Sequence, residues 1–156
     1  MNISVGAPAP DFSLHNSNDE VTTLSDYQGK QNVLILFFPM AFSGICAEEM
    51  CSLRDNYGQY HDLDAQILGI SKDSVHVLKA WVAAEQFQFP LLSDFNHEVA
   101  PQYDSSFGEL AWMRNVPKRS AFVVDKQGVV RYAEVGATAA DLPDFEAIRA
   151  VLADLG

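Results

Sequence analysis

The feature that most constrains the fold is a run of six apolar residues, at positions 33–38, that ends at Pro39. A run of this length without alternation is typical of a strand buried on both faces of a sheet. Pro39 has no N–H to pair and ends the strand. Residues 45–60 then follow a helical pattern, in which Met50, Leu53 and Tyr57 recur at three- and four-residue spacing. A buried strand followed directly by a helix predicts an α/β fold.

The rest of the chain continues this alternation. We expect further strands at residues 65–70, 120–124 and 129–135, and helices at residues 74–86, 97–103 and 145–155. The turn sequence Asp-Lys-Gln-Gly joins the last two strands as a hairpin. A second hairpin is expected at the N-terminus, where apolar positions flank a polar stretch at residues 15–20. The chain is therefore predicted to form one domain, residues 1–156, with a central mixed β-sheet flanked by helices.

Charge and composition argue against several classes of protein. The net charge of −11 and the scattered basic residues disfavour a nucleic-acid surface and an anionic membrane as partners. The longest apolar run, residues 33–41, is too short to span a bilayer, and we find no secretory signal. Two cysteines and four histidines show no zinc-like spacing, so no metal site is expected. These features favour a cytoplasmic protein.

Cys46 lies close to the predicted start of the helix that follows the buried strand. The unpaired N–H groups and the positive end of the helix dipole at this position favour a thiolate over a thiol. Two close cysteines in a reducing compartment also indicate chemistry rather than a structural disulfide. By its position alone, Cys46 could equally be a small buried apolar residue.

The sequence around Cys46 carries a more specific signal. Residues 38–46, Phe-Pro-Met-Ala-Phe-Ser-Gly-Ile-Cys, resemble the peroxiredoxin motif Pro-x-x-x-Thr/Ser-x-x-Cys. The similarity extends to Gly-Ala-Pro-Ala-Pro-Asp-Phe-Ser-Leu at residues 6–14, Phe-Pro-Leu-Leu-Ser-Asp at 89–94 and Arg-Ser-Ala-Phe-Val-Val-Asp at 119–125. The chain most resembles the alkyl-hydroperoxidase E-like branch. The resemblance implies a thioredoxin-like fold with an N-terminal hairpin extension, and a thiol peroxidase that needs no cofactor.

The resemblance also assigns catalytic roles. It implies that Cys46 attacks hydrogen peroxide or an organic hydroperoxide, that Pro39 covers the thiolate, and that Ser43 hydrogen-bonds the peroxide. Threonine is more usual at the position of Ser43. Arg119 aligns with the active-site arginine, whose charge stabilises the thiolate and the leaving oxygen. Glu49 aligns with a glutamate that orients this arginine.

Each of these residues also has a plainer interpretation. Pro39 could be only a strand terminator, and Ser43 only a helix cap. Lys118 or Arg114 could take the place of the aligned arginine, since an isolated arginine at a strand start is usually a surface residue. Glu48, the neighbouring acid, is expected in solvent.

The chain has a second cysteine, Cys51, whereas this branch often works with one cysteine. Its spacing, Cys-Ala-Glu-Glu-Met-Cys, resembles the resolving pair of the bacterioferritin-comigratory, or Q-type, branch. On an intact helix, Cα atoms five residues apart are separated by about 8.6 Å. A disulfide needs about 7 Å or less. The helix must therefore unwind before Cys51 can condense with oxidised Cys46; alternatively, Cys51 is a small packing residue.

The expected cycle passes through a sulfenic acid on Cys46 and a Cys46–Cys51 disulfide. The resemblance implies thioredoxin or a glutaredoxin-like protein as the reductant. Two alternatives remain: a one-cysteine cycle completed by a low-molecular-weight thiol, and a redox relay that senses peroxide for a partner protein. A homodimer that uses the face around the catalytic loop is expected from the habit of the family.

Overall fold

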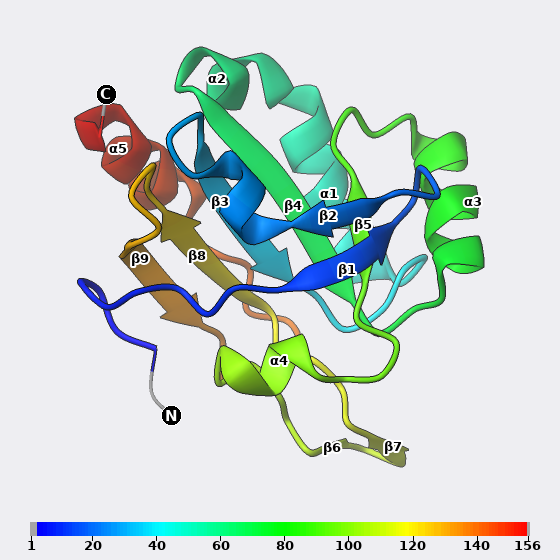
Figure 1. The fold of residues 1–156 in the computed structure, drawn as a ribbon. Coiled ribbons are helices and arrows are strands. Elements are labelled where there is room, and N and C mark those ends of the chain that lie inside the picture. The colour runs from blue at the N-terminus through cyan, green and yellow to red at the C-terminus, as the bar shows by residue number, and fades with distance from the viewer. Residues whose placement is uncertain (1–2, 156) are drawn as a thin grey trace.

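The computed structural model describes residues 3–155, which form a seven-stranded mixed sheet in the order β2-β1-β5-β4-β3-β8-β9 (Figure 1). Its strands are β1 (Ser13–Asn16), β2 (Val21–Thr23), β3 (Asn32–Phe37), β4 (Ala65–Ser71), β5 (Leu91–Ser93), β8 (Ser120–Val124) and β9 (Val130–Val135). Strands β3, β4 and β5 are parallel to one another, and the remaining pairs are antiparallel. A separate two-stranded ribbon consists of β6 (Glu109–Leu110) and β7 (Met113–Arg114).

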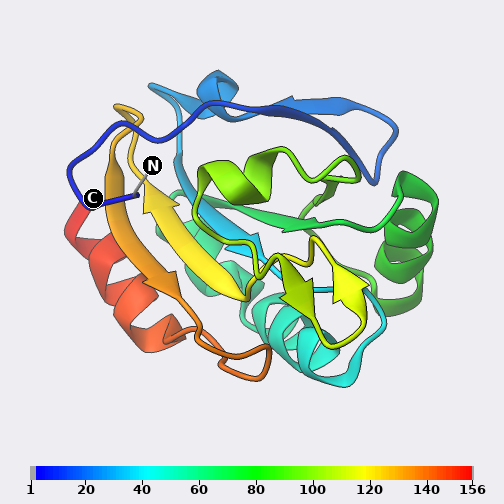
Figure 2. The same cartoon turned by 90° about the horizontal axis from the view of Figure 1, so that it is seen from below.

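Helices cover both faces of the large sheet. Side chains of α1 (Gly44–Asp55), α2 (Tyr57–Asp62), α3 (Val75–Glu85) and α5 (Phe145–Leu155) share one apolar cluster with the sheet. The N-terminal segment, the 3-10 helix η1 (Leu24–Tyr27) and α4 (Val99–Gln102) contribute to a second cluster on the opposite face. Figure 2 shows the N-terminal segment and α4 on one side of the sheet and α1 and α5 on the other. Within residues 3–155, no helix is long and apolar enough to cross a membrane.

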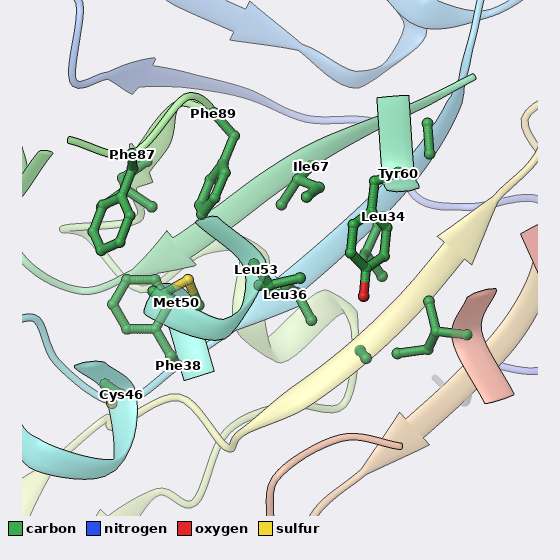
Figure 3. Packing of buried hydrophobic residues seen from close by; sticks show 14 of the residues in the cluster. Leu34, Leu36, Phe38, Cys46, Met50, Leu53, Tyr60, Ile67, Phe87 and Phe89 are labelled. Carbon is green, nitrogen blue, oxygen red and sulfur yellow. The ribbon is translucent and has the colours of Figure 1, made fainter. Parts of the chain in front are cut away.

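Strand β3 lies between these two apolar clusters, and all six of its residues are buried. Because successive side chains of a strand point to opposite faces, Leu34 and Leu36 enter one cluster, whereas Ile35 and Phe37 enter the other. Full burial of such a side chain contributes roughly 1.5–3 kcal/mol. Cys46 lies at one end of the first cluster, as Figure 3 shows. A strand that is buried on both faces therefore leads directly to this cysteine.

The predicted α/β fold with a central mixed sheet and an N-terminal hairpin is confirmed. The prediction of one continuous helix over residues 45–60 was wrong, because the helix is interrupted at Asn56 between α1 and α2. Asn56 leaves the helical conformation, with φ of −113° and ψ of 18°, and its side chain donates to the Ser52 carbonyl at 2.8 Å. The β6–β7 ribbon was not predicted, because its strands have only two residues each.

Candidate active site

Cys46 is the third residue of α1, where the carboxyl end of β3 leads into this helix. Ser43 occupies the N-cap position with extended backbone angles, and its carbonyl accepts from the Ala47 N–H at 2.8 Å. The Cys46 side chain is fully buried. The sulfur therefore lies within the first turn of α1, where the partial positive charge of the helix favours an anion.

Arg119 reaches this sulfur from the neighbouring strand. It directly precedes β8, which pairs with β3 in a register that places Ser120 opposite Phe37. Arg119 Nη2 lies 3.0 Å from Cys46 Sγ and donates to it. Its Nε donates to the Ala139 carbonyl at 2.8 Å, and its side chain is 2% exposed. All three guanidinium nitrogens have protein partners, because Nη1 binds Glu49.

Glu49 lies one helical turn after Cys46, so both side chains point to the same face of α1. Its Oε1 accepts from Arg119 Nη1 at 2.6 Å, while Oε2 is buried without a partner among the described residues. Burial raises the pKa of the Glu49 carboxyl to about 7, and the neighbouring Arg119 guanidinium acts in the opposite direction. The charge state of the carboxylate that holds Arg119 therefore changes near neutral pH.

The Ser43 hydroxyl does not cap the helix. It donates instead to the Met40 carbonyl at 2.9 Å, so the interpretation of its side chain as a cap alone was wrong. With its proton engaged, the oxygen keeps its lone pairs to accept a hydrogen bond from another molecule. Pro39, two residues after the end of β3, is buried and contributes no N–H to the site.

A cavity of about 330 Å³ opens beside these residues. Pro39, Ser43 and Arg119 line it. Its wall is otherwise mostly apolar, with Met40, Ile45, Leu110, Ala139 and Ala140. A small molecule in this cavity would meet one permanent positive charge and one hydroxyl on an apolar background.

The other candidates lie elsewhere. Lys118 places its Nζ 5.8 Å from the centre of the Phe107 ring, and Arg114 is exposed. Glu48 is exposed, whereas Glu49 is buried. Among the described basic residues considered for the site, Arg119 is the one that contacts the sulfur.

Cys51 is separate from this group. Both cysteines are free thiols on the same uninterrupted helix. Cys51 Sγ donates to Glu85 Oε2 of α3 at 3.4 Å, and Arg54 Nη1 binds the same carboxylate oxygen at 3.2 Å. Burial, followed by the hydrogen bond to the Glu85 carboxylate, raises the pKa of the Cys51 thiol. In this conformation Cys51 is held as a thiol and bound to α3.

Sequence reasoning missed three residues that support the site. The carbonyl of Ala139 holds Arg119, but a backbone acceptor leaves no signal in the sequence. Glu85 holds Cys51 from a distant helix, a contact that depends on tertiary packing. Asp73 binds the loop before Cys46, and its place after the parallel strand β4 could have indicated it, because functional groups gather at the carboxyl ends of such strands.

Comparison with known proteins identifies the class. The model of the AhpC/TSA family matches residues 5–133, and the chain belongs to this family. The protein is therefore a peroxiredoxin, a thiol-dependent peroxidase with a thioredoxin-like fold. This confirms the family, the fold and the peroxidase activity that the sequence predicted.

Among its relatives, the chain is 42% identical to alkyl hydroperoxide reductase E of Mycobacterium tuberculosis over 134 residues, which cover 85% of this chain and 86% of the relative. It is 32% identical to the chloroplastic 2-Cys peroxiredoxin BAS1 of Hordeum vulgare, covering 84% of this chain and 65% of that protein. The crystal structure of the peroxidoxin BcpB from Mycobacterium tuberculosis superposes with a TM-score of 0.87 and 27% identity, covering 99% of both chains. The resemblance to the alkyl-hydroperoxidase E-like branch is thereby confirmed.

Proposed function

We propose that Cys46 is the peroxidatic cysteine. Its thiolate attacks one oxygen of a hydroperoxide, the O–O bond breaks, and an S–O bond forms. Sulfur is oxidised to a sulfenic acid, while the other oxygen takes a proton and leaves as water or an alcohol. The observation that carries this assignment is the 3.0 Å contact between Arg119 Nη2 and the buried Cys46 sulfur.

The surrounding residues have distinct roles in this step. Arg119 stabilises the thiolate before the attack and the negative charge on the departing oxygen during it. Glu49 and the Ala139 carbonyl fix the orientation of the guanidinium. Ser43 accepts a hydrogen bond from the peroxide and aligns its oxygens with the sulfur. Pro39 shields the thiolate without adding a buried donor.

The substrates we propose are hydrogen peroxide and organic hydroperoxides. The cavity of about 330 Å³ beside Arg119 supports the second class, because its wall is largely apolar. Met40, Ile45 and Leu110 would contact an alkyl group, while Ser43 and Arg119 bind the oxygens.

For the second half of the cycle we propose that Cys51 condenses with the sulfenic acid. Its place on the same helix, five residues after Cys46, supports this role. A thioredoxin or a glutaredoxin-like protein then reduces the disulfide, in the cytoplasm, where thiol reductants are available. The second candidate is a one-cysteine cycle with a low-molecular-weight thiol, which the binding of Cys51 to Glu85 favours. In a peroxide-sensing relay, a partner's thiol would take the place of these reductants.

We also propose a homodimer that uses the face around the catalytic loop. Two aromatic side chains near this loop support it, because Trp112 is 87% exposed and Phe42 is 56% exposed. Large exposed apolar groups of this kind are typical of contact surfaces. Light scattering should then show a dimer for the wild type and a shift toward the monomer for Trp112→Glu.

The decisive experiment compares wild type with Cys46→Ser in a peroxide-consumption assay with excess dithiol reductant. We expect the wild type to consume hydrogen peroxide and an alkyl hydroperoxide, and the variant to consume neither while keeping its circular dichroism spectrum. Cys51→Ser serves as the control for loss of any thiol, since it should still react once with peroxide. Turnover by Cys46→Ser above background would overturn the assignment.

A further inference from the structure

The loop between β3 and α1 needs support that the sheet cannot provide. The β3–β4 ladder runs to the pair Phe37 and Ile70, and the Phe38 N–H still donates to the Ile70 carbonyl at 3.0 Å. Pro39 then has no N–H to donate, so the regular ladder cannot continue through it. The residues that follow must be held in another way.

Asp73 provides this support from the chain beyond β4. Its Oδ2 accepts a hydrogen bond from the Ala41 N–H at 2.7 Å, across 32 positions of sequence. A hydrogen bond from a backbone N–H to a carboxylate is charge-assisted and stronger than one between neutral groups. Asp73 thus takes over, with a side chain, the pairing that the backbone of β4 gives to β3.

The Asp73 carboxylate is itself fixed. The same Oδ2 accepts from the Ser71 hydroxyl at 2.7 Å, and the Asp73 N–H donates to that hydroxyl oxygen at 3.2 Å. From β5, the Ser93 hydroxyl donates to the Asp73 carbonyl at 2.6 Å. Asp73 is therefore anchored to two strands of the sheet before it reaches the loop.

The position after Ala41 shows why such an anchor matters. Phe42 has a φ of 63°, in the left-handed region that residues with a side chain rarely adopt. Such a conformation persists only when its surroundings hold it in place. The Ala41–Asp73 hydrogen bond holds the preceding residue, and the Phe42 ring lies 5.9 Å from the Trp81 ring, centre to centre. Ser43 is the next residue.

We propose that Asp73 is a positioning residue for peroxide reduction, because it fixes the left-handed turn at Phe42 and thereby the position of Ser43 in the wall of the cavity. This inference rests on the proposed role of Ser43 in binding the peroxide. Asp73 does not contact Cys46 or Arg119 in the structure, so it acts on the peroxide-binding loop and leaves the Arg119–Cys46 contact unchanged.

The test separates the geometry of the loop from the reactivity of the sulfur. Asp73→Ala should slow sulfenic acid formation with hydrogen peroxide by roughly 10- to 100-fold, since misplacing a positioning group by about 1 Å costs that much. Alkylation of Cys46 by iodoacetamide, which does not need Ser43, should stay close to the wild-type rate. Asp73→Asn keeps an acceptor oxygen and should restore most of the peroxide rate. Both reactions are followed with Cys51→Ser as the common background.

Three controls make the outcomes distinct. Asp154→Ala removes an exposed aspartate and should change neither rate. Ser43→Ala tests the proposed role of the hydroxyl, and an unchanged peroxide rate there would reject that role whatever Asp73 does. Thermal denaturation checks that each variant is folded. An unchanged peroxide rate in Asp73→Ala, an equal loss of both reactions, or a failure of Asp73→Asn to recover would overturn the inference about Asp73.

Discussion

Arg119 Nη2 lies 3.0 Å from Cys46 Sγ, although 73 positions separate the two residues in the sequence. The contact results from the antiparallel pairing of β3 and β8, which places the residue before Ser120 beside the end of β3. Both groups are buried, so water screens their interaction little. The pairing of β3 and β8 thus brings the full positive charge of Arg119 to the sulfur, in addition to the partial charge at the start of α1.

Replacing Arg119 by alanine should slow the reaction of Cys46 with peroxide by roughly 10²- to 10³-fold, the usual loss when one stabilising donor is removed. Stopped-flow kinetics of sulfenic acid formation would measure this. Arg119→Lys keeps the positive charge but not the planar guanidinium, which donates to Glu49 and to the Ala139 carbonyl at the same time. It should therefore recover only part of the rate. Lys118→Ala is the matched control, and a loss there equal to that of Arg119→Ala would contradict the assignment.

Glu49 predicts a specific dependence of stability on pH. Its pKa is raised by burial to about 7 in the folded protein, so the folded state holds this proton more tightly than the unfolded chain does. The protonated Glu49 carboxyl therefore adds to the free energy of unfolding. This contribution is complete below the ordinary carboxyl pKa and is lost as the pH rises through about 7. Glu49→Gln should therefore become more stable relative to wild type between about pH 5 and pH 8, by on the order of a few kcal/mol.

Urea unfolding of wild type and Glu49→Gln over this pH range measures the difference. The two proteins differ only at residue 49, so contributions from the rest of the chain cancel in the difference. Glu48→Gln, on the exposed side of α1, should show no such trend. A stability difference between wild type and Glu49→Gln that does not change with pH would mean that the Glu49 carboxyl keeps its ordinary pKa.

The fold was largely predictable because β3 carries a signal that depends on burial alone. Six apolar residues followed by proline define a central strand and its end, whatever the rest of the chain does. The break at Asn56 was not predictable in the same way. The apolar spacing continues from Leu53 to Tyr57, so the hydrophobic pattern predicts one helix, whereas the break lies in the backbone angles of one polar residue.

The site was predictable where it depends on the chemistry of a side chain, as in the meeting of Cys46 and Arg119, whose catalytic roles stay predictions. It was not predictable where the support is a backbone atom or a tertiary contact. Ala139 acts through its carbonyl, and Glu85 meets Cys51 only because α1 and α3 pack together. The hydrogen bond of the Ser43 hydroxyl was not predictable either, since the sequence allowed a helix cap and the hydroxyl binds the Met40 carbonyl instead.

Glu85 should control the reactivity of Cys51. Burial first, and then the hydrogen bond to the Glu85 carboxylate, raises the pKa of this thiol. Glu85→Gln removes the negative charge, so the pKa of Cys51 should fall toward its ordinary value and alkylation should begin at lower pH. Mass spectrometry of iodoacetamide-treated protein, in a Cys46→Ser background, follows Cys51 alone. Glu146→Gln, an exposed acid on α5, is the control, and an equal shift there would contradict the prediction.

Formation of a Cys46–Cys51 disulfide should unwind the first turns of α1. A Cys46–Cys51 disulfide requires α1 to unwind, because helical residues five apart are about 8.6 Å apart at Cα and a disulfide needs about 7 Å or less. Unwinding also breaks the hydrogen bond from Cys51 to Glu85 and draws the first turn, with Cys46, away from Arg119. Hydrogen exchange of amides 45–53 should therefore be slow in the reduced protein and faster after stoichiometric peroxide.

Cys51→Ser should react with the first peroxide as fast as wild type, because it leaves Cys46 and Arg119 in place. It should then fail to turn over with thioredoxin and should accumulate sulfinic acid on Cys46, since no internal thiol intercepts the sulfenic acid. Intact mass after one equivalent of peroxide separates the two cycles: wild type loses two hydrogens if a disulfide forms, and the variant gains oxygen. If wild type also gains oxygen, or if the variant cycles equally well with thioredoxin, Cys51 is a packing residue bound to Glu85 and the one-cysteine cycle operates.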